Sequence, residues 1–366
     1  MRYVTLGDVC KKASSNVAQK DILSNDGKYP IYGASGLIKT VDFYHQEQAY
    51  IAIVKDGAGV GRTTLLPEHS SVIGTMQYII PNELVDIKYL YYAIVHMDLA
   101  KYYMGAAIPH IYFKDYQKEP LKLPTLSEQK QIAAIFETID RIIDLRKSQL
   151  AQLDQAVKSR FIELFGDPIL NPKEWPVCEL SEHIQFLTSG SRGWSQYFSG
   201  SGEYFITIKN VKNCQITLDD VQYVVPPDNA EAKRTRVQEG DLLISITADL
   251  GRTGVVTKEI AEYGGYINQH LTCVRLNQNA VRPLYVAYYM ESEAGKNQFQ
   301  AKNQSAVKAG LNFNSINSLR LIVPPIELQD KFISFVEETD KSKLAVQQGL
   351  QELEILKKSL MQQYFG

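Results

Sequence analysis

Arginine, lysine, asparagine and glutamine recur in glycine-rich stretches of this 366-residue chain, and such side chains can bond to nucleic acid. Arginine can form two hydrogen bonds to guanine, asparagine or glutamine can form two to adenine, and lysine and arginine can pair with phosphates. Glycine lets the backbone approach a ligand closely. These stretches span residues 55–64, 102–114, 188–200, 248–254 and 301–310, and the basic stretch 232–236, which has no glycine, is considered with them.

Candidate contact residues come from both halves of the chain. They are Lys55, Arg62, Thr63, His110, Lys114, Arg192, Trp194, Tyr197, Lys209, Arg234, Arg236, Arg252, Lys302, Asn303 and Lys308. The same composition is typical of ordinary exposed loops, so for each stretch both interpretations stay open.

Motifs of three enzyme classes are incomplete. Residues 57–63 (GAGVGRT) resemble a phosphate-binding loop but lack the GxxxxGK[ST] spacing and its lysine. Residues 227–233 (PDNAEAK) contain the letters of a PD-ExK nuclease, yet this spacing cannot place two carboxylates on separate strands around a metal. No DPPY-like tetrapeptide of adenine methyltransferases occurs, and the histidines do not pair locally with cysteine or serine. We therefore expect no catalytic residues, no metal and no cofactor.

The cysteines and the overall composition place the chain among ordinary globular proteins. Cys10, Cys178, Cys214 and Cys273 stand singly, which favours free, mostly buried thiols over disulfides or zinc ligands. Hydrophobic residues make up 45% and charged residues 22%, a balance typical of two to three domains. With no leader after Met1 and no apolar run near ~20 residues, we expect a cytoplasmic protein without a membrane partner.

Charge does not favour either half as a strongly basic surface. Residues 1–122 contain 13 Lys and Arg against 12 Asp and Glu, and residues 167–322 contain 15 against 16. Contact with phosphates would depend on local patches, so we expect weak DNA binding by the isolated chain.

A long repeat determines the expected organisation. Residues 124–166 and 324–366 align without a gap, 200 positions apart, with ten identities in 43 positions. Weaker matches continue upstream, for example GRTTLL at 61–66 against GRTGVV at 251–256. Each half is therefore expected to contain a divergent globular head, at 1–122 and 167–322, followed by a better preserved segment, at 123–166 and 323–366.

The preserved segments are expected to be long helices. Apolar residues recur every three or four positions, Thr125 with Glu128 forms a capping-box pattern, and Gly166 before Asp167 supplies a stop. The chain order favours antiparallel pairing of the two helices around a pseudo-twofold axis, while packing of each helix on its own head remains the alternative. The expected contact positions are Gln129, Ile132, Phe136, Ile139, Ile143, Leu150, Leu153, Gln329, Phe332, Val346, Leu350 and Leu353.

The heads are expected to be mixed α/β domains. Period-two patterns predict strands at 48–54, 77–80, 241–246 and 271–276, and helices are expected near 86–100 and 283–298. The fold class is thus α/β with mixed α+β heads, joined by a coiled-coil-like helical pair.

Residues 105–140, their copy ending at 340, the YPIYG stretch at 29–33 and the head-helix order resemble the specificity (S) subunit of type I restriction-modification enzymes. The paired PxxxxQ starts, Pro124 to Gln129 and Pro324 to Gln329, are the most specific element. The second half departs from the pattern, because it lacks a YPIYG equivalent and opens its helix with PPIELQ.

The resemblance implies a function without catalysis. Two target recognition domains would each recognise one half of a bipartite site in double-stranded DNA. The helices would set the spacing and bind DNA adenine methyltransferase (M) subunits, expected to be two, and restriction/translocase (R) subunits through the complex. A two-headed scaffold that binds proteins without DNA specificity is the alternative.

Overall fold

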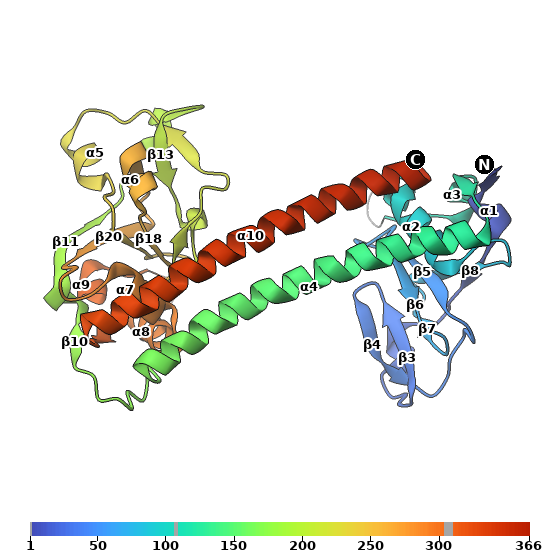
Figure 1. Ribbon diagram of the computed structural model, residues 1–366, viewed down its shortest axis with the longest axis horizontal. Coiled ribbons are helices and arrows are strands. Elements are labelled where there is room, and N and C mark those ends of the chain that lie inside the picture. The colour runs from blue at the N-terminus through green and yellow to red at the C-terminus, as the bar shows by residue number, and fades with distance from the viewer. Residues whose placement is uncertain (1, 106–108, 304–309) are drawn as a thin grey trace. The chain divides into compact units, whose positions relative to one another are not determined.

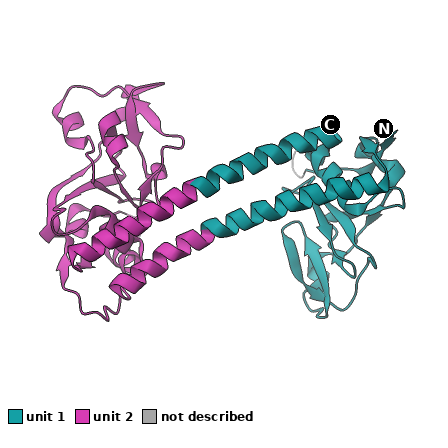
Figure 2. Cartoon of the chain, viewed as in Figure 1, with its two compact units in different colours: residues 1–150, 345–366 teal, residues 151–344 magenta. Residues whose placement is uncertain are grey.

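The chain folds into two compact units. The computed structural model describes residues 2–105, 109–303 and 310–366. Residues 1–150 with 345–366 form unit 1, and residues 151–344 form unit 2 (Figure 2). Each unit contains one head and parts of two long helices, α4 (Leu126–Phe165) and α10 (Ile326–Phe365) (Figure 1).

The head of unit 1 is built on a four-stranded antiparallel sheet in the order β2-β8-β5-β6. The strands β3, β4 and β7, which alternate in sequence with strands of the main sheet, form a second, three-stranded sheet in the order β4-β3-β7. All five residues of the central strand β5 are buried, because the run YIAIV has apolar side chains for both faces. The elements are β1 (Arg2–Thr5), α1 (Leu6–Val9), β2 (Cys10–Ser14), η1 (Gln19–Ile22), β3 (Tyr29–Gly33), β4 (Gly36–Val41), β5 (Tyr50–Val54), β6 (Thr63–Leu66), β7 (Ser71–Val72), β8 (Met76–Pro81), α2 (Ile87–Met97), η2 (Leu99–Tyr102), α3 (Phe113–Tyr116) and β9 (Pro120–Leu123).

The head of unit 2 repeats this plan with different lengths. Its main sheet has the order β11-β20-β17-β18, so each strand has a counterpart in unit 1. The elements are β10 (Val177–Glu179), η3 (Leu180–His183), β11 (Ile184–Ser189), η4 (Trp194–Tyr197), β12 (Phe198–Ser199), β13 (Glu203–Ile206), η5 (Ile208–Asn210), β14 (Val211–Lys212), β15 (Gln215–Ile216), β16 (Gln222–Val224), α5 (Ala230–Thr235), β17 (Leu242–Ser245), β18 (Thr253–Val255), α6 (Lys258–Tyr263), β19 (Gly265–Ile267), β20 (Leu271–Leu276), α7 (Pro283–Glu291), α8 (Glu293–Lys302), α9 (Phe313–Asn317) and β21 (Arg320–Ile322).

The predicted mixed α/β heads are confirmed. The second half lacks the YPIYG letters of β3, as noted from the sequence, yet it has a strand in the equivalent position, because β13 pairs in parallel with β19 as β3 pairs in parallel with β7. The strand is kept although its letters changed, because apolar side chains are sufficient for a buried strand position.

The two predicted long helices are present, and their ends follow local signals. Thr125 and Glu128 form the expected capping box, with Thr125 N donating to Glu128 Oε2 at 2.8 Å and Glu128 N donating to Thr125 Oγ1 at 3.3 Å. Gly166 ends α4 with φ +81°, a left-handed conformation that glycine adopts without strain.

Within each unit the two helices run in opposite directions. In unit 1, Phe136 of α4 stacks on Phe365 at the end of α10, with ring centroids 5.6 Å apart. In unit 2, Phe161 near the end of α4 packs on Phe332 near the start of α10, at 5.3 Å. Several apolar residues of the predicted stripe are buried, namely Ile132, Phe136, Ile139, Ile143, Phe332 and Val346. Leu150, Leu153, Leu350 and Leu353 are only half-buried.

Candidate nucleic-acid interface

The glycine-rich stretches of unit 1 meet at one edge of its main sheet. The loop from β5 to β6 closes on itself, because Gly61 N donates to Val54 O at 2.8 Å and Val54 N donates to Arg62 O at 2.9 Å. The stretch before α3 lies against this loop, since Gly57 N donates to Pro109 O at 2.9 Å. Two stretches that are about fifty residues apart in sequence therefore form one surface.

The same edge in unit 2 has the same backbone bonds. Gly251 N donates to Ser245 O at 3.0 Å, and Ser245 N donates to Arg252 O at 2.9 Å. Leu311 N donates to Ile246 O at 2.9 Å, as Ile111 N donates to Lys55 O at 3.0 Å in unit 1. The loops 55–62 and 246–252 are therefore structural equivalents.

The shared GRT letters have a structural reason at the glycine. Gly61 has φ +85°, and a Cβ on it would lie 2.5 Å from Ala100 N. Gly251 has φ +80°, and a Cβ on it would lie 2.2 Å from Phe299 Cδ2. Only glycine tolerates both the conformation and the close approach, so this turn places Arg62 and Arg252 at equivalent positions.

Polar side chains surround the edge of unit 1. Asp56 bonds to the His110 imidazole, and Lys55 Nζ lies 3.6 Å from Asp56 Oδ2. Arg62 Nη1 donates to Ala34 O at 2.8 Å. Lys114 is exposed and lies 5.2 Å from the centre of the Tyr112 ring. Thr63 begins β6 at this edge.

Arginines surround the corresponding edge of unit 2. Arg234 of α5 is held by the end of β11, donating to Ser189 O at 3.1 Å and Ser191 Oγ at 3.3 Å, and Arg192 is exposed beside them. Arg252 Nη2 lies 2.5 Å from Asp249 Oδ2. The structure thus brings residues 232–234 against residues 188–191, which the sequence left separate. The loop 248–252 follows β17, whose end lies at the same end of the main sheet.

Other candidates lie elsewhere or have other partners. Trp194 is 4% exposed and packs on Phe205 and Tyr266, so its predicted role as a contact residue is wrong. A large aromatic side chain gains more from burial than from exposure, even in a glycine-rich stretch. Tyr197 packs beside Trp194, and Arg236 pairs with Glu203 at 3.1 Å. Lys209 is exposed on η5, and Lys302 Nζ donates to Ser318 Oγ at 2.7 Å. Asn303 is exposed and its Oδ1 accepts from Gly310 N, whereas Lys308 lies outside the described residues.

The cysteines are free, as expected. Among the described residues, Cys178 is the one cysteine whose thiol lies beside a histidine, an arrangement that resembles a nucleophile and its general base. Its Sγ lies 3.2 Å from His183 Nε2. Burial, and then the charge of Glu182, raise the pKa of the Cys178 thiol to about 11. The thiol therefore stays protonated at neutral pH, which is unfavourable for nucleophilic chemistry.

Sequence reasoning did not select the polar run Asn268, Gln269 and His270, which joins β19 to β20 at the edge of unit 2. Ser191 forms a bridge with Asn268, and His270 Nδ1 lies 2.7 Å from Thr247 Oγ1. An available signal was the abrupt change from apolar strand residues to three consecutive polar ones.

The repeated glutamines Gln129 and Gln329 attach the long helices to the heads. Gln129 Oε1 accepts from Asp86 N at 2.7 Å, and its Nε2 donates to Pro124 O at 2.9 Å. Gln329 Oε1 accepts from Arg282 N at 2.8 Å, and its Nε2 donates to Pro324 O at 2.9 Å. Both side chains are fully buried, which explains the PxxxxQ pattern by geometry.

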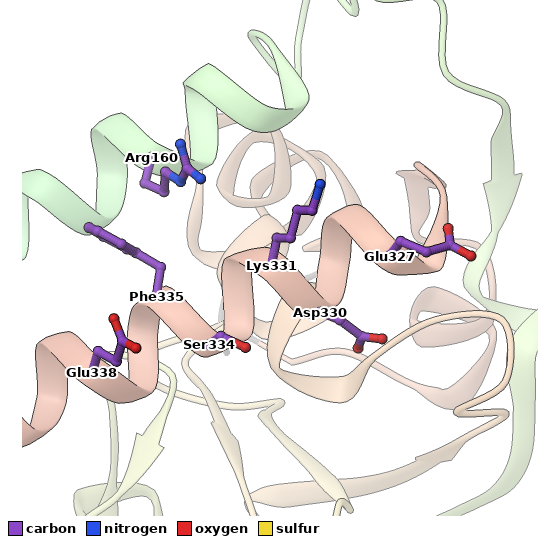
Figure 3. Close-up of a pocket in the computed structure, with 7 residues that line it drawn as sticks. All are labelled: Arg160, Glu327, Asp330, Lys331, Ser334, Phe335 and Glu338. Atoms are coloured by element: carbon purple, nitrogen blue, oxygen red, sulfur yellow. The ribbon is translucent and has the colours of Figure 1, made fainter.

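A groove of about 470 Å³ lies between the end of α4 and the start of α10 in unit 2. Arg160 of α4 lies over the Phe335 ring of α10, at 5.8 Å from its centre (Figure 3). The α10 wall carries three acidic side chains and one basic one, which are Glu327, Asp330, Glu338 and Lys331. The charged lining is typical of a surface that binds another macromolecule rather than an apolar small molecule.

Family comparison identifies the repeated unit. A family model described as the type I restriction modification DNA specificity domain matches residues 1–155 and 172–355. The chain belongs to this family. Each matched stretch of the specificity-domain family runs from the first strand of a head into a long helix, so the family's domain coincides with the sequence repeat.

Curated relatives in this family are similar at moderate identity. The specificity subunit of the type I restriction enzyme EcoBI from Escherichia coli is 21% identical over 259 residues, covering 64% of this chain and 54% of that protein. The putative MjaX specificity subunit from Methanocaldococcus jannaschii is 24% identical over 292 residues, covering 75% and 66%. The EcoKI specificity subunit of Escherichia coli K12 is 26% identical over 251 residues, covering 64% and 53%. The chain therefore matches about half to two thirds of the length of these relatives.

Solved structures support the fold. The type I restriction-modification S subunit from M. genitalium matches with a TM-score of 0.64 and 15% identity, covering 100% of this chain and 96% of that one. A chain from a structural study of complex assembly and conformational transition of the type I R-M system matches with a TM-score of 0.60 and 16% identity, covering 100% and 97%. In the described part of this chain, no helix is long and apolar enough to span a membrane.

Proposed function

We propose that this chain is the DNA specificity subunit of a type I restriction-modification system, in which each head recognises one half of a bipartite duplex site. The observation that supports it best is the repeated sheet edge. The two edges share a backbone frame and an arginine, Arg62 or Arg252, but differ in most other side chains. A shared frame with different side chains suits two half-sites of different sequence.

The proposed complex places chemistry in other subunits. We propose that the chain contributes no catalytic residue, that two DNA adenine methyltransferase subunits bind its helices, and that restriction/translocase subunits join through that complex. The charged groove beside Arg160 and Phe335 supports the helices as a binding surface. The continuous 40-residue length of α4 supports a role for helix length in setting the spacer.

The charge balance supports DNA binding that depends on partners. Because residues 1–122 contain 13 basic and 12 acidic residues, their net charge is close to zero and the overall attraction to phosphates is weak. The chain alone should bind DNA weakly, and the assembly with methyltransferase should bind tightly. Tight, salt-resistant binding by the isolated chain would contradict this part.

Methylation mapping tests the function. Long-read sequencing of strains with and without the gene, expressed together with the methyltransferase of the proposed system, should show one bipartite methylated motif that depends on this chain. If the complex assembles yet no motif changes, the DNA-specificity proposal fails and the protein-binding scaffold is favoured.

A further inference from the structure

The loop between β19 and β20 holds the same place in unit 2 that the loop between β7 and β8 holds in unit 1. Asn268 N donates to Ile206 O at 3.1 Å, as Ile73 N donates to Tyr32 O at 2.9 Å. His270 O accepts from Ile246 N, and Thr75 O accepts from Lys55 N, both at 3.0 Å. These bonds align Gln269 with Gly74 and His270 with Thr75.

The side chains at these aligned positions differ in chemistry. Gly74 has no side chain, so it offers a DNA base only backbone atoms. Gln269 has an amide with one acceptor and two donors, and it is half-buried. This loop therefore distinguishes the two edges more sharply than the shared arginines do.

His270 fixes the position of the Gln269 amide. Gln269 Nε2 lies 3.2 Å from His270 Nε2, and His270 Nδ1 lies 2.7 Å from Thr247 Oγ1. An amide nitrogen can only donate, so His270 Nε2 accepts and the imidazole hydrogen is on Nδ1, donating to Thr247. His270 N also donates to Asn268 Oδ1 at 3.1 Å, which holds the loop itself.

One amide hydrogen of Gln269 points at His270, which leaves the carbonyl oxygen and the second amide hydrogen. Among the residues that the structure describes, no other group bonds to this oxygen. An acceptor beside a donor matches the major-groove edge of adenine, which offers the N6 amino group and N7. A held side chain loses less entropy on binding than a free one.

We propose that Gln269 recognises an adenine in the half-site of the second head, with His270 and Thr247 as positioning residues. This inference rests on the proposed DNA-specificity function. Arg252 closes the loop that contains Thr247, and Arg234 donates to Ser189 O at the end of β11, so each of these two elements carries a basic side chain. Arg234 can supply attraction to phosphates around the base contact.

Unit 1 holds an imidazole at the same place from another loop. Asp56, which aligns with Thr247, bonds to His110 rather than to residue 75. With glycine at 74, unit 1 has no amide to present at that position. The two half-sites should therefore differ at the base pair that Gln269 contacts.

The test uses the full chain, co-expressed with its methyltransferase, and maps methylated sites by long-read sequencing. In the Gln269→Ala variant, discrimination for one A·T pair of one half-site should fall by roughly 5- to 150-fold, while the other half-site stays unchanged. Gln269→Glu should shift the preference at that pair toward cytosine, whose N4 amino group donates to a carboxylate.

Positioning variants separate a specificity role from a purely structural one. Thr247→Val and His270→Ala should reduce discrimination at the same base pair, whereas Thr247→Ser, which keeps the hydroxyl, should retain it. A purely structural role would lower methylation at all sites equally and lower the melting temperature. Arg252→Ala identifies the half-site of this head.

The failures of the two proposals are distinguishable. A wild-type complex that methylates no bipartite motif would remove the proposed function. If every folded Gln269 variant methylates the same motif as the wild type, the adenine contact alone is overturned. It is also overturned if the Gln269 variants change the half-site that Arg252→Ala leaves intact.

Discussion

At the residue scale, Gln129 and Gln329 show what the internal repeat preserves. Each bonds to a backbone N–H at the start of a head helix and to the carbonyl of the proline five residues before it. Tyr89 and Tyr285 repeat this pattern, since their hydroxyls donate to Lys122 O at 2.8 Å and Ile322 O at 2.9 Å. Buried polar groups need hydrogen-bond partners, which is a physical reason for both copies to keep these bonds.

Gln329→Ala should lower the free energy of unfolding of unit 2 by about 2–4 kcal/mol, because it leaves buried backbone groups without partners. Both tryptophans, Trp175 and Trp194, belong to unit 2, so tryptophan fluorescence during urea unfolding follows that unit. Gln129→Ala, the matched change in unit 1, should move this transition less. A loss below about 0.5 kcal/mol in Gln329→Ala would contradict the assigned bonds.

Arg62 and Arg252 are predicted to act on separate half-sites. Each follows the positive-φ glycine of its loop, so either side chain can be shortened without changing the turn. Arg62→Ala should weaken recognition of the first half-site only, by ~1–3 kcal/mol if it bonds to a base, and Arg252→Ala should do the same for the second. Competition binding with the assembled complex and single-base variants of the site measures it. Uniform loss over all sequences would assign a phosphate contact instead.

At the scale of elements, the long helices combine strong local signals with a tertiary contact that repeats. Phe365 lies 5.2 Å from the ring of Tyr89 in unit 1, and Phe165 lies 4.8 Å from the ring of Tyr285 in unit 2. The end of each helix therefore fills an equivalent site on the head from the other half of the sequence. This exchange supports the predicted antiparallel arrangement within each unit.

Helix length is predicted to set the DNA spacer. About four residues, one ~5.4 Å turn, added after Leu150 and after Leu344 should lengthen the unspecified spacer by one or two base pairs of ~3.4 Å. Both half-sites should stay the same, because the heads are unchanged. Methylation mapping measures the spacer, and a variant that keeps the original spacing would show that the helices do not determine it.

At the scale of the whole molecule, the repeat predicts that one half can substitute for the other. A fragment of residues 1–166 keeps the site formed by Tyr89 and Phe136 but loses Phe365, which fills it. It also keeps Phe165, the equivalent side chain. A second copy can thus supply the missing helix end in an isologous twofold dimer.

The fragment should form a concentration-dependent dimer. Phe136, Ile139 and Ile143 would be reburied, each contributing ~1.5–3 kcal/mol before the cost of association. Arg146 is exposed and bonds to Gln149 at 3.1 Å, so its charge can remain in water near the axis. Light scattering and methylation mapping should show a dimer that modifies an inverted repeat of the first half-site. A monomer at tens of micromolar would contradict the prediction.

The sequence by itself determined the repeat, the two long helices, two central strands of each head and the family. These features are recorded locally, as a fixed offset between copies, a three-to-four residue apolar period and a capping box. Gln129 and Gln329 could be selected for the same reason, although their bonds to Asp86 and Arg282 could not be predicted.

Only the tertiary structure decided which loops meet and which side chains face out. Trp194 is buried against Tyr266 and His270 bonds to Thr247, because strand order brings together segments far apart in the chain. No local pattern encodes such pairings. The sequence therefore located the candidate contact loops in general, whereas the tertiary structure showed which side chains lie together at the ends of β8 and β20.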